Sequence, residues 1–213
     1  MIDTHLPWVR VSASSECGTV ENAPRLAWRW DDLLAAQASG EDPTAPWREA
    51  LAASTARQYG RPAPPAVPAA FVLQWALEVP ATVAVYAVVL GPWDPDLSAA
   101  SLSFDLTPQL FPGHLRLRSA RPANATGEAR RTAARAAYEA LARPFAATYE
   151  PGVRLGPHQR QAMVDDVWAM ALHRAQAAVA ERPAPPPQRD SCCFIYALPG
   201  THECAGCPRL RRR

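Results

Sequence analysis

Cysteines are concentrated at the C-terminal end of this sequence. Four of the five lie in the segment RDSCCFIYALPGTHECAGCPRLRRR, which runs from Arg189 to Arg213. They have the spacing C-C-x10-C-x2-C and are Cys192, Cys193, Cys204 and Cys207. In a reducing compartment, clustered cysteines indicate metal ligands before they indicate disulfides. The spacing therefore predicts a metal centre held by four thiolates.

The vicinal pair distinguishes between two kinds of metal centre. A structural zinc site prefers a gap of two to four residues within each cysteine pair, whereas Cys192 and Cys193 are adjacent. Neighbouring side chains in an extended segment point in opposite directions, so one ion reaches both thiolates only through a contorted backbone. In a [2Fe-2S] cluster the two sulfurs can bind different irons. A same-iron arrangement, with Cys204 and Cys207 on the other iron, is the alternative, and the sequence leaves the pairing open.

Other polar residues are weaker candidates for metal ligands. Cys17 lies far from the cluster motif and is interpreted as an ordinary thiol. His202 lies between the cysteine pairs, but four thiols already suffice, so a place beside the ligands or in solvent is favoured. Asp165 and Asp166 are expected on a solvated helix face, with a role near the metal centre as the alternative. The remaining histidines without metal-type spacing include His114, His158 and His173.

Composition indicates an ordinary globular protein. The chain has 213 residues, 48% of them hydrophobic and 20% charged, which suits one main domain with an appended module. The formal net charge of +2 is too small to argue for nucleic-acid binding. No basic stretch followed by an apolar stretch is visible at the N-terminus, so we expect a cytoplasmic protein.

Apolar periodicity predicts mainly helices. The stretches WDDLLAAQA and APWREALAASTARQYG predict short helices, the second beginning near Pro46 and ending at Gly60. WVRVSASSE alternates weakly, as a short edge strand would. The run from Ala69 to Gly91 is long enough to span a membrane, but Gln74, Glu78 and Pro80 fall near its middle. We interpret it as a buried core helix bent or broken at Pro80, with a peripheral membrane contact as the alternative.

The second half predicts a hairpin and two longer helices. SLSFDL and HLRLRS alternate apolar and polar residues on either side of a turn. Helical spacing follows over about 127–148 and 157–180, and ERPAPPPQRD then forms a stiff extended spacer. The fold class is therefore α+β, mainly helical with a small β-hairpin or sheet and a C-terminal cluster-binding loop. We expect an N-terminal helical or irregular region (1–62), a helical core with the hairpin (63–182) and the spacer with the cysteine segment (183–213).

The segment RDSCCFIYALPGTHECAGCP resembles the C-terminal [2Fe-2S] motif of FhuF-like ferric siderophore reductases. In that motif an Arg and a polar residue precede C-C, an aromatic-apolar stretch follows, and C-x2-C-P closes. The resemblance, which is weaker upstream, covers about Pro65 to Pro208. It implies a [2Fe-2S] cofactor whose ligands are Cys192, Cys193, Cys204 and Cys207. It also implies an enzyme that reduces Fe(III) in a hydroxamate-type siderophore by one electron and releases Fe(II).

The sequence leaves the partners and alternatives partly open. No G-x-G-x-x-G or Walker loop is present, so electrons should come from an external ferredoxin or reductase. Alternatives are an iron-sulfur redox sensor or electron-transfer subunit, or a zinc-stabilised nucleic-acid-binding module. Trp75, Trp93 and Trp168 are expected in the core rather than in a siderophore pocket. Five arginines are expected to raise the cluster potential or to orient an acidic donor, with a solvated tail as the alternative for the last three; they are Arg189, Arg209, Arg211, Arg212 and Arg213.

Overall fold

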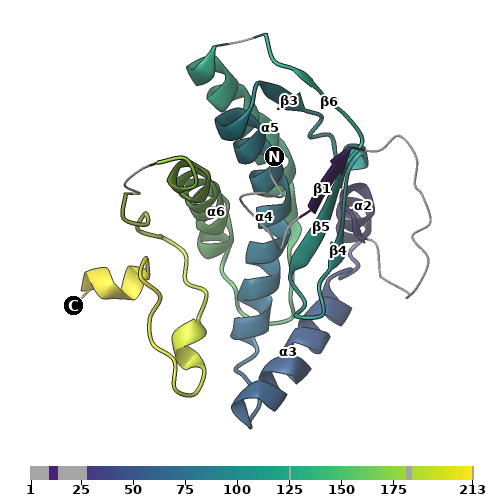
Figure 1. Cartoon of the computed structure of the whole chain (residues 1–213). Coiled ribbons are helices and arrows are strands. Elements are labelled where there is room, and N and C mark those ends of the chain that lie inside the picture. Colours follow the sequence, from purple (N-terminus) through teal and green to yellow (C-terminus); the bar gives the residue numbers. More distant parts are fainter. Residues whose placement is uncertain (1–9, 14–27, 125, 181–183, 213) are drawn as a thin grey trace.

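The computed structural model describes residues 10–13, 28–124, 126–180 and 184–212 (Figure 1). Its α-helices are α2 (Trp30–Ala38), α3 (Ala45–Tyr59), α4 (Ala66–Leu90), α5 (Gly127–Thr148) and α6 (Pro157–Ala177). Its strands are β1 (Arg10–Ala13), β2 (Trp28–Arg29), β3 (Trp93–Pro95), β4 (Leu102–Leu106), β5 (Pro112–Leu117) and β6 (Ala120–Pro122). Short 3-10 turns are η1 (Ala99–Ser101), η2 (Ile195–Ala197) and η3 (Pro208–Arg212). The fold is α+β and mainly helical, as the sequence predicts.

Helix α4 runs through the middle of the core and packs against α3, α5 and α6 (Figure 1). It is continuous through Pro80, so the predicted break is wrong, whereas the alternative of a bend there stays a prediction. Proline removes one backbone hydrogen bond from a helix, and because Pro80 is buried here, packing around the helix offsets that loss. In the described part of the chain, α4 alone is long and apolar enough to cross a membrane. Since 67% of its most apolar window is buried, the core-helix interpretation is supported.

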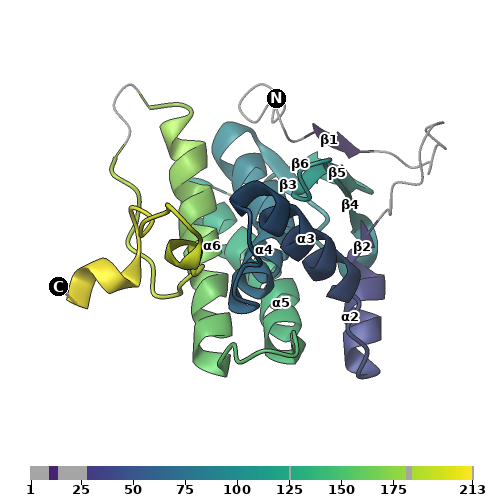
Figure 2. The ribbon, with the colours of Figure 1, turned by 90° about the horizontal axis from the view of Figure 1, so that it is seen from below.

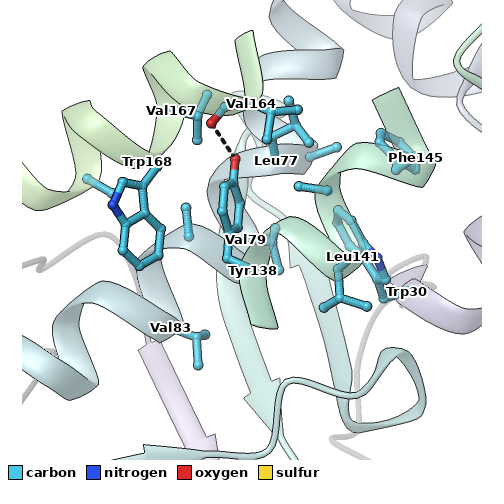
Figure 3. Packing of buried hydrophobic residues seen from close by; sticks show 14 of the residues in the cluster. Trp30, Leu77, Val79, Val83, Tyr138, Leu141, Phe145, Val164, Val167 and Trp168 are labelled. Atoms are coloured by element: carbon cyan, nitrogen blue, oxygen red, sulfur yellow. Dashed lines mark hydrogen bonds between the residues drawn. The ribbon is translucent and has the colours of Figure 1, made fainter. Parts of the chain in front are cut away.

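Helices α5 and α6 complete the layer around α4. The buried Tyr138 hydroxyl of α5 donates a 2.9 Å hydrogen bond to the Val164 carbonyl of α6, as Figure 3 shows. The Trp168 ring lies 5.4 Å from the Tyr138 ring, between centroids, and is buried as predicted. The predicted helix boundaries hold for α5, whereas α6 ends at Ala177 rather than Ala180. These contacts fix the position of α6, on which the cysteine segment lies.

A mixed four-stranded sheet of order β1-β5-β4-β2 packs on the helices. The predicted hairpin is confirmed: β4 and β5 are antiparallel, with Phe104 opposite Leu115 on the buried face. At one edge β1 pairs in parallel with β5, which agrees with the weak alternation in WVRVSASSE. Strands β3 and β6 form a separate two-stranded ribbon.

The C-terminal segment, residues 184–212, lies on the outer side of α6, away from the sheet. Figures 1 and 2, which differ by a quarter turn, both show it against α6. Residues 184–188 have no regular structure, which agrees with the predicted extended spacer. The division of the chain at residues 62 and 182 stays a prediction.

Candidate metal centre

A buried carboxylate holds the start of the cysteine segment on α6. Asp166 is 6% exposed, and its Oδ2 accepts hydrogen bonds from the Ser191 backbone N–H at 2.7 Å and the Ser191 hydroxyl at 2.5 Å. Its Oδ1 accepts the Asp190 N–H at 3.0 Å. Hydrogen bonds to a charged group are worth about 1.5–3 kcal/mol each. The interpretation of Asp166 as part of a solvated face is therefore wrong, because the cysteine segment covers that side of α6.

Arg189 is the second buried charge at this junction. It is 7% exposed, and its Nε lies 3.7 Å from Asp166 Oδ2. Its guanidinium also donates to Gln74 Oε1 on α4 at 3.0 Å and to Ser191 Oγ at 3.2 Å. Gln74 in turn donates to Glu78 Oε1 at 3.2 Å. Arg189, three residues before the first cysteine pair, is thus fixed to both α4 and α6.

The first cysteine pair is held by one further contact with α6. The Gln159 side-chain amide donates to the Cys192 carbonyl oxygen at 2.7 Å. Directly after the pair, Phe194 has a φ of 59°, a conformation that costs energy for a residue other than glycine. Its partly buried side chain packs against the core, and its N–H points at Cys192 Sγ at 3.4 Å. Anchoring of the ring holds this strained turn, which aims the amide at the sulfur.

The second cysteine pair lies in a tight turn against Arg189. The Cys207 N–H donates to the Cys204 carbonyl at 2.9 Å, and the Gly206 carbonyl accepts the Arg189 N–H at 2.9 Å. A Cβ on Gly206 would lie 2.7 Å from the Pro187 carbonyl oxygen and 3.3 Å from Arg189 Cγ. Only glycine lets this backbone approach so closely. The turn therefore brings the second pair beside the first.

The four thiols interact with one another. Burial raises the pKa of Cys192, and the neighbouring Cys193 and Cys207 raise it further against the lowering effect of the Phe194 amide. The pKa of Cys204 is raised to about 11, mainly by burial and also by Cys193, while the Arg189 charge acts in the opposite direction. Cys193 and Cys207 are themselves buried. A cysteine loses its thiol proton when it binds a metal ion, so metal binding at this site would release protons.

This donor set fits a cluster with two metal ions. All four thiols are free, and none is held in a disulfide. Across the described ranges, no three His, Cys, Asp or Glu side chains are arranged around one metal ion. Cys192 interacts with Cys193 and Cys207, and Cys204 interacts with the same two thiols, so the four sulfurs form one group. Four thiolates are the usual ligands of a [2Fe-2S] cluster.

The structure separates the weaker candidates from this site. His202 and His158 are exposed, and Asp165 pairs with Arg135 and Arg143 between α5 and α6. Cys17 lies outside the described residues, as do Arg213 and the side chains of Arg211 and Arg212.

The three tryptophans do not behave alike. Trp168 is in the core and Trp75 packs on it partly buried, whereas Trp93 is 43% exposed on β3, so its predicted core position is wrong. Two clefts, lined mainly by residues of β3, β6 and α5, lie beyond the C-terminal end of α4. The cysteine segment contacts Gln74 in the other half of α4, so neither cleft belongs to the site.

Fold and site together define a mainly helical α+β protein with a C-terminal four-thiol iron-sulfur segment. Residues 189–209 match the family model of the FhuF 2Fe-2S C-terminal domain. No curated protein and no solved structure matches the chain. The resemblance is confirmed over these residues: the segment is an FhuF-type domain, and its cofactor is a [2Fe-2S] cluster. The weaker resemblance upstream stays a prediction.

Three residues that hold the segment in place were not predicted to do so: sequence reasoning missed Gln159 and Gly206, and it gave Asp166 a role near the metal centre only as the alternative. Only Gly206 carried a local signal, because a glycine within a C-x2-C turn indicates close backbone approach. The roles of Gln159 and Asp166 depend on tertiary contacts, because the helix pattern does not predict which face of α6 the C-terminal segment covers.

Proposed function

We propose that this protein is a ferric siderophore reductase in which Cys192, Cys193, Cys204 and Cys207 ligate the [2Fe-2S] cluster. The observation that carries the proposal is the match of residues 189–209 to the FhuF 2Fe-2S domain. The same residues form a four-thiol segment fixed to α4 and α6 by buried contacts. A segment fixed in this way keeps its ligands in place when charge changes.

The substrate proposed is an Fe(III) hydroxamate complex. Ferric iron is a hard cation that prefers oxygen ligands, and ferrous iron binds them far less tightly. One electron therefore releases the metal: Fe(III)-siderophore plus one electron gives Fe(II) and the free siderophore. When bound, the cluster supplies that one electron.

The chain's own residues have two tasks in this reaction. Asp166, Arg189 and Gln159 fix the cysteine segment, so little reorganisation accompanies electron transfer. Cys192 and Cys204 remain partly exposed, which leaves that side of the centre open to a substrate. The other two cysteines, Cys193 and Cys207, are buried. The exposed edge is where we place contact with the ferric complex.

We further propose that an external ferredoxin or reductase supplies the electron. The absence of a nicotinamide- or flavin-binding motif from the sequence supports an external donor. A cytoplasmic location is part of the proposal, because thiols stay reduced there. A peripheral contact with the inner face of the membrane remains an alternative for the same reductase.

The test is a single-turnover assay without oxygen. Purified protein is reduced with dithionite, desalted and mixed with a ferric trihydroxamate in the presence of a ferrous chelator. We expect the cluster to reoxidise and one ferrous chelate to form per electron. Cys204→Ser should be inactive, and Cys17→Ser should react like the wild type. A reduced cluster that leaves ferric hydroxamates unchanged would support the redox-sensor or electron-transfer alternative instead.

A further inference from the structure

Two opposite charges are buried together where the cysteine segment meets α6. The Arg189 and Asp166 side chains are 9% and 6% exposed, and their closest N–O distance is 3.7 Å. Neither is needed as a metal ligand. Burying two charges is costly unless each is well bonded. Their position beside the cysteines therefore indicates a role in the function of the site as well as in folding.

The arginine side chain lies directly against the second cysteine pair. Its Cγ is 3.3 Å from where a Cβ would stand on Gly206, which directly precedes Cys207 in the sequence. The Arg189 N–H bonds the Gly206 carbonyl.

The carboxylate fixes where this cation lies. Asp166 Oδ2 faces Arg189 Nε, while Gln74 and the Ser191 hydroxyl accept hydrogen bonds from the same guanidinium nitrogen. The cation is thus held from α4, from α6 and from its own segment. Arg209, by contrast, lies on the surface with 49% of its side chain exposed, over the Tyr196 ring and near Glu203.

We propose that Asp166 and Arg189 are a positioning pair of fixed charges. Arg189 raises the reduction potential of the cluster, and Asp166 lowers it. The proposal rests on ligation by the four cysteines as given above. Reduction takes the cluster with its four thiolates from a formal charge of about −2 to about −3. A fixed cation favours that step and a fixed anion opposes it, and buried charges are screened little by salt.

The experiment is a redox titration of the anaerobically purified full chain, followed by electron paramagnetic resonance of the reduced cluster. Arg189→Gln should lower the equilibrium constant for reduction about tenfold, equivalent to about 59 mV for one electron. Asp166→Asn keeps its shape and acceptor oxygen but loses its charge, so it should raise that constant. Arg189→Lys keeps the charge and should stay nearer the wild type than Arg189→Gln. The matched surface control, Arg209→Gln, should change the constant less than about twofold, since exposed charges are screened.

A purely structural role predicts a different pattern. Both charge-removing variants would then lose the cluster faster and leave the potential unchanged, or shift it in the same direction, and either result would overturn the proposal. If Arg189→Gln does not retain the cluster, Asp166→Asn and Arg189→Lys decide the question. An unchanged potential in Asp166→Asn would then refute it.

The titration and the siderophore assay test the two proposals independently. The titration uses a chemical reductant and needs no siderophore. Opposed shifts in a protein that leaves ferric hydroxamates unchanged would contradict the reductase alone. Active reductase without opposed shifts would contradict the positioning pair alone.

Discussion

The side-chain amide of Gln159, in the first turn of α6, donates a 2.7 Å hydrogen bond to the carbonyl oxygen of Cys192. This contact joins a helix of the core to the backbone of the first cysteine pair. Together with the bonds from Ser191 to Asp166, it means that the start of the metal site is built on α6 rather than on a free tail.

Gln159→Ala should loosen the cluster without unfolding the protein. An intramolecular hydrogen bond contributes about 0.5–1.5 kcal/mol, so transfer of iron to a strong chelator should become about two- to tenfold faster. His158→Ala is the matched control, because His158 is the exposed neighbour on the same turn. The measurement is the loss of visible absorbance after chelator is added. Equal rates for the two variants would show that the Gln159 contact has no influence on the site.

Gly206→Ala should damage cluster binding more severely. The added methyl would lie 2.7 Å from the Pro187 carbonyl oxygen, so the turn between the second cysteine pair must move. We expect substoichiometric iron in the purified variant. Gly156→Ala is the control, because a Cβ there meets nothing within 4 Å and its φ of −61° suits alanine. Full iron content in Gly206→Ala would contradict the close packing described here.

Each cysteine of the motif should be needed for a stable cluster. Replacement of Cys192, Cys193, Cys204 or Cys207 by Ser should abolish or strongly reduce the iron and sulfide retained on purification, because thiolates are the cluster's usual ligands. Cys17→Ser should retain both in full. Iron and acid-labile sulfide are measured per chain. A motif variant that keeps a wild-type cluster would remove that residue from the ligand set.

The buried Tyr138 predicts a specific loss of stability at high pH. Burial raises the pKa of its phenol well above the ordinary value. As pH rises past about 10, the unfolded chain releases a phenol proton that the folded chain keeps, so the free energy of unfolding falls. Tyr138→Phe removes this dependence but also the bond to Val164, which should cost about 1 kcal/mol near neutral pH.

The check is urea unfolding of wild type and Tyr138→Phe at about pH 8 and about pH 11, on either side of the ordinary tyrosine pKa. The wild type should lose more stability between the two conditions than the variant does. Equal losses would show that Tyr138 does not control the alkaline unfolding.

Local patterns predicted much of the fold. The alternation that pairs Phe104 with Leu115 and the helical spacing of α5 each extend over several residues, and burial of one face explains both. Pro80 misled the prediction, because a helix buried on nearly all sides tolerates a missing hydrogen bond that an exposed helix would not.

The spacing of the four cysteines predicts the segment that carries the candidate site, but not the residues that support it. Asp165 and Asp166 are adjacent and chemically identical, and only the docking of a distant segment makes one a surface ion-pair partner and the other a buried acceptor. That distinction depends on contacts far apart in the sequence, which no local pattern encodes.

The most direct test of the account is the metal and sulfide content of the wild-type protein purified without oxygen. Four cysteine ligands around a [2Fe-2S] cluster predict about two irons and two acid-labile sulfides per chain, with a red-brown colour that dithionite bleaches. A colourless protein with one zinc ion and no sulfide would contradict it.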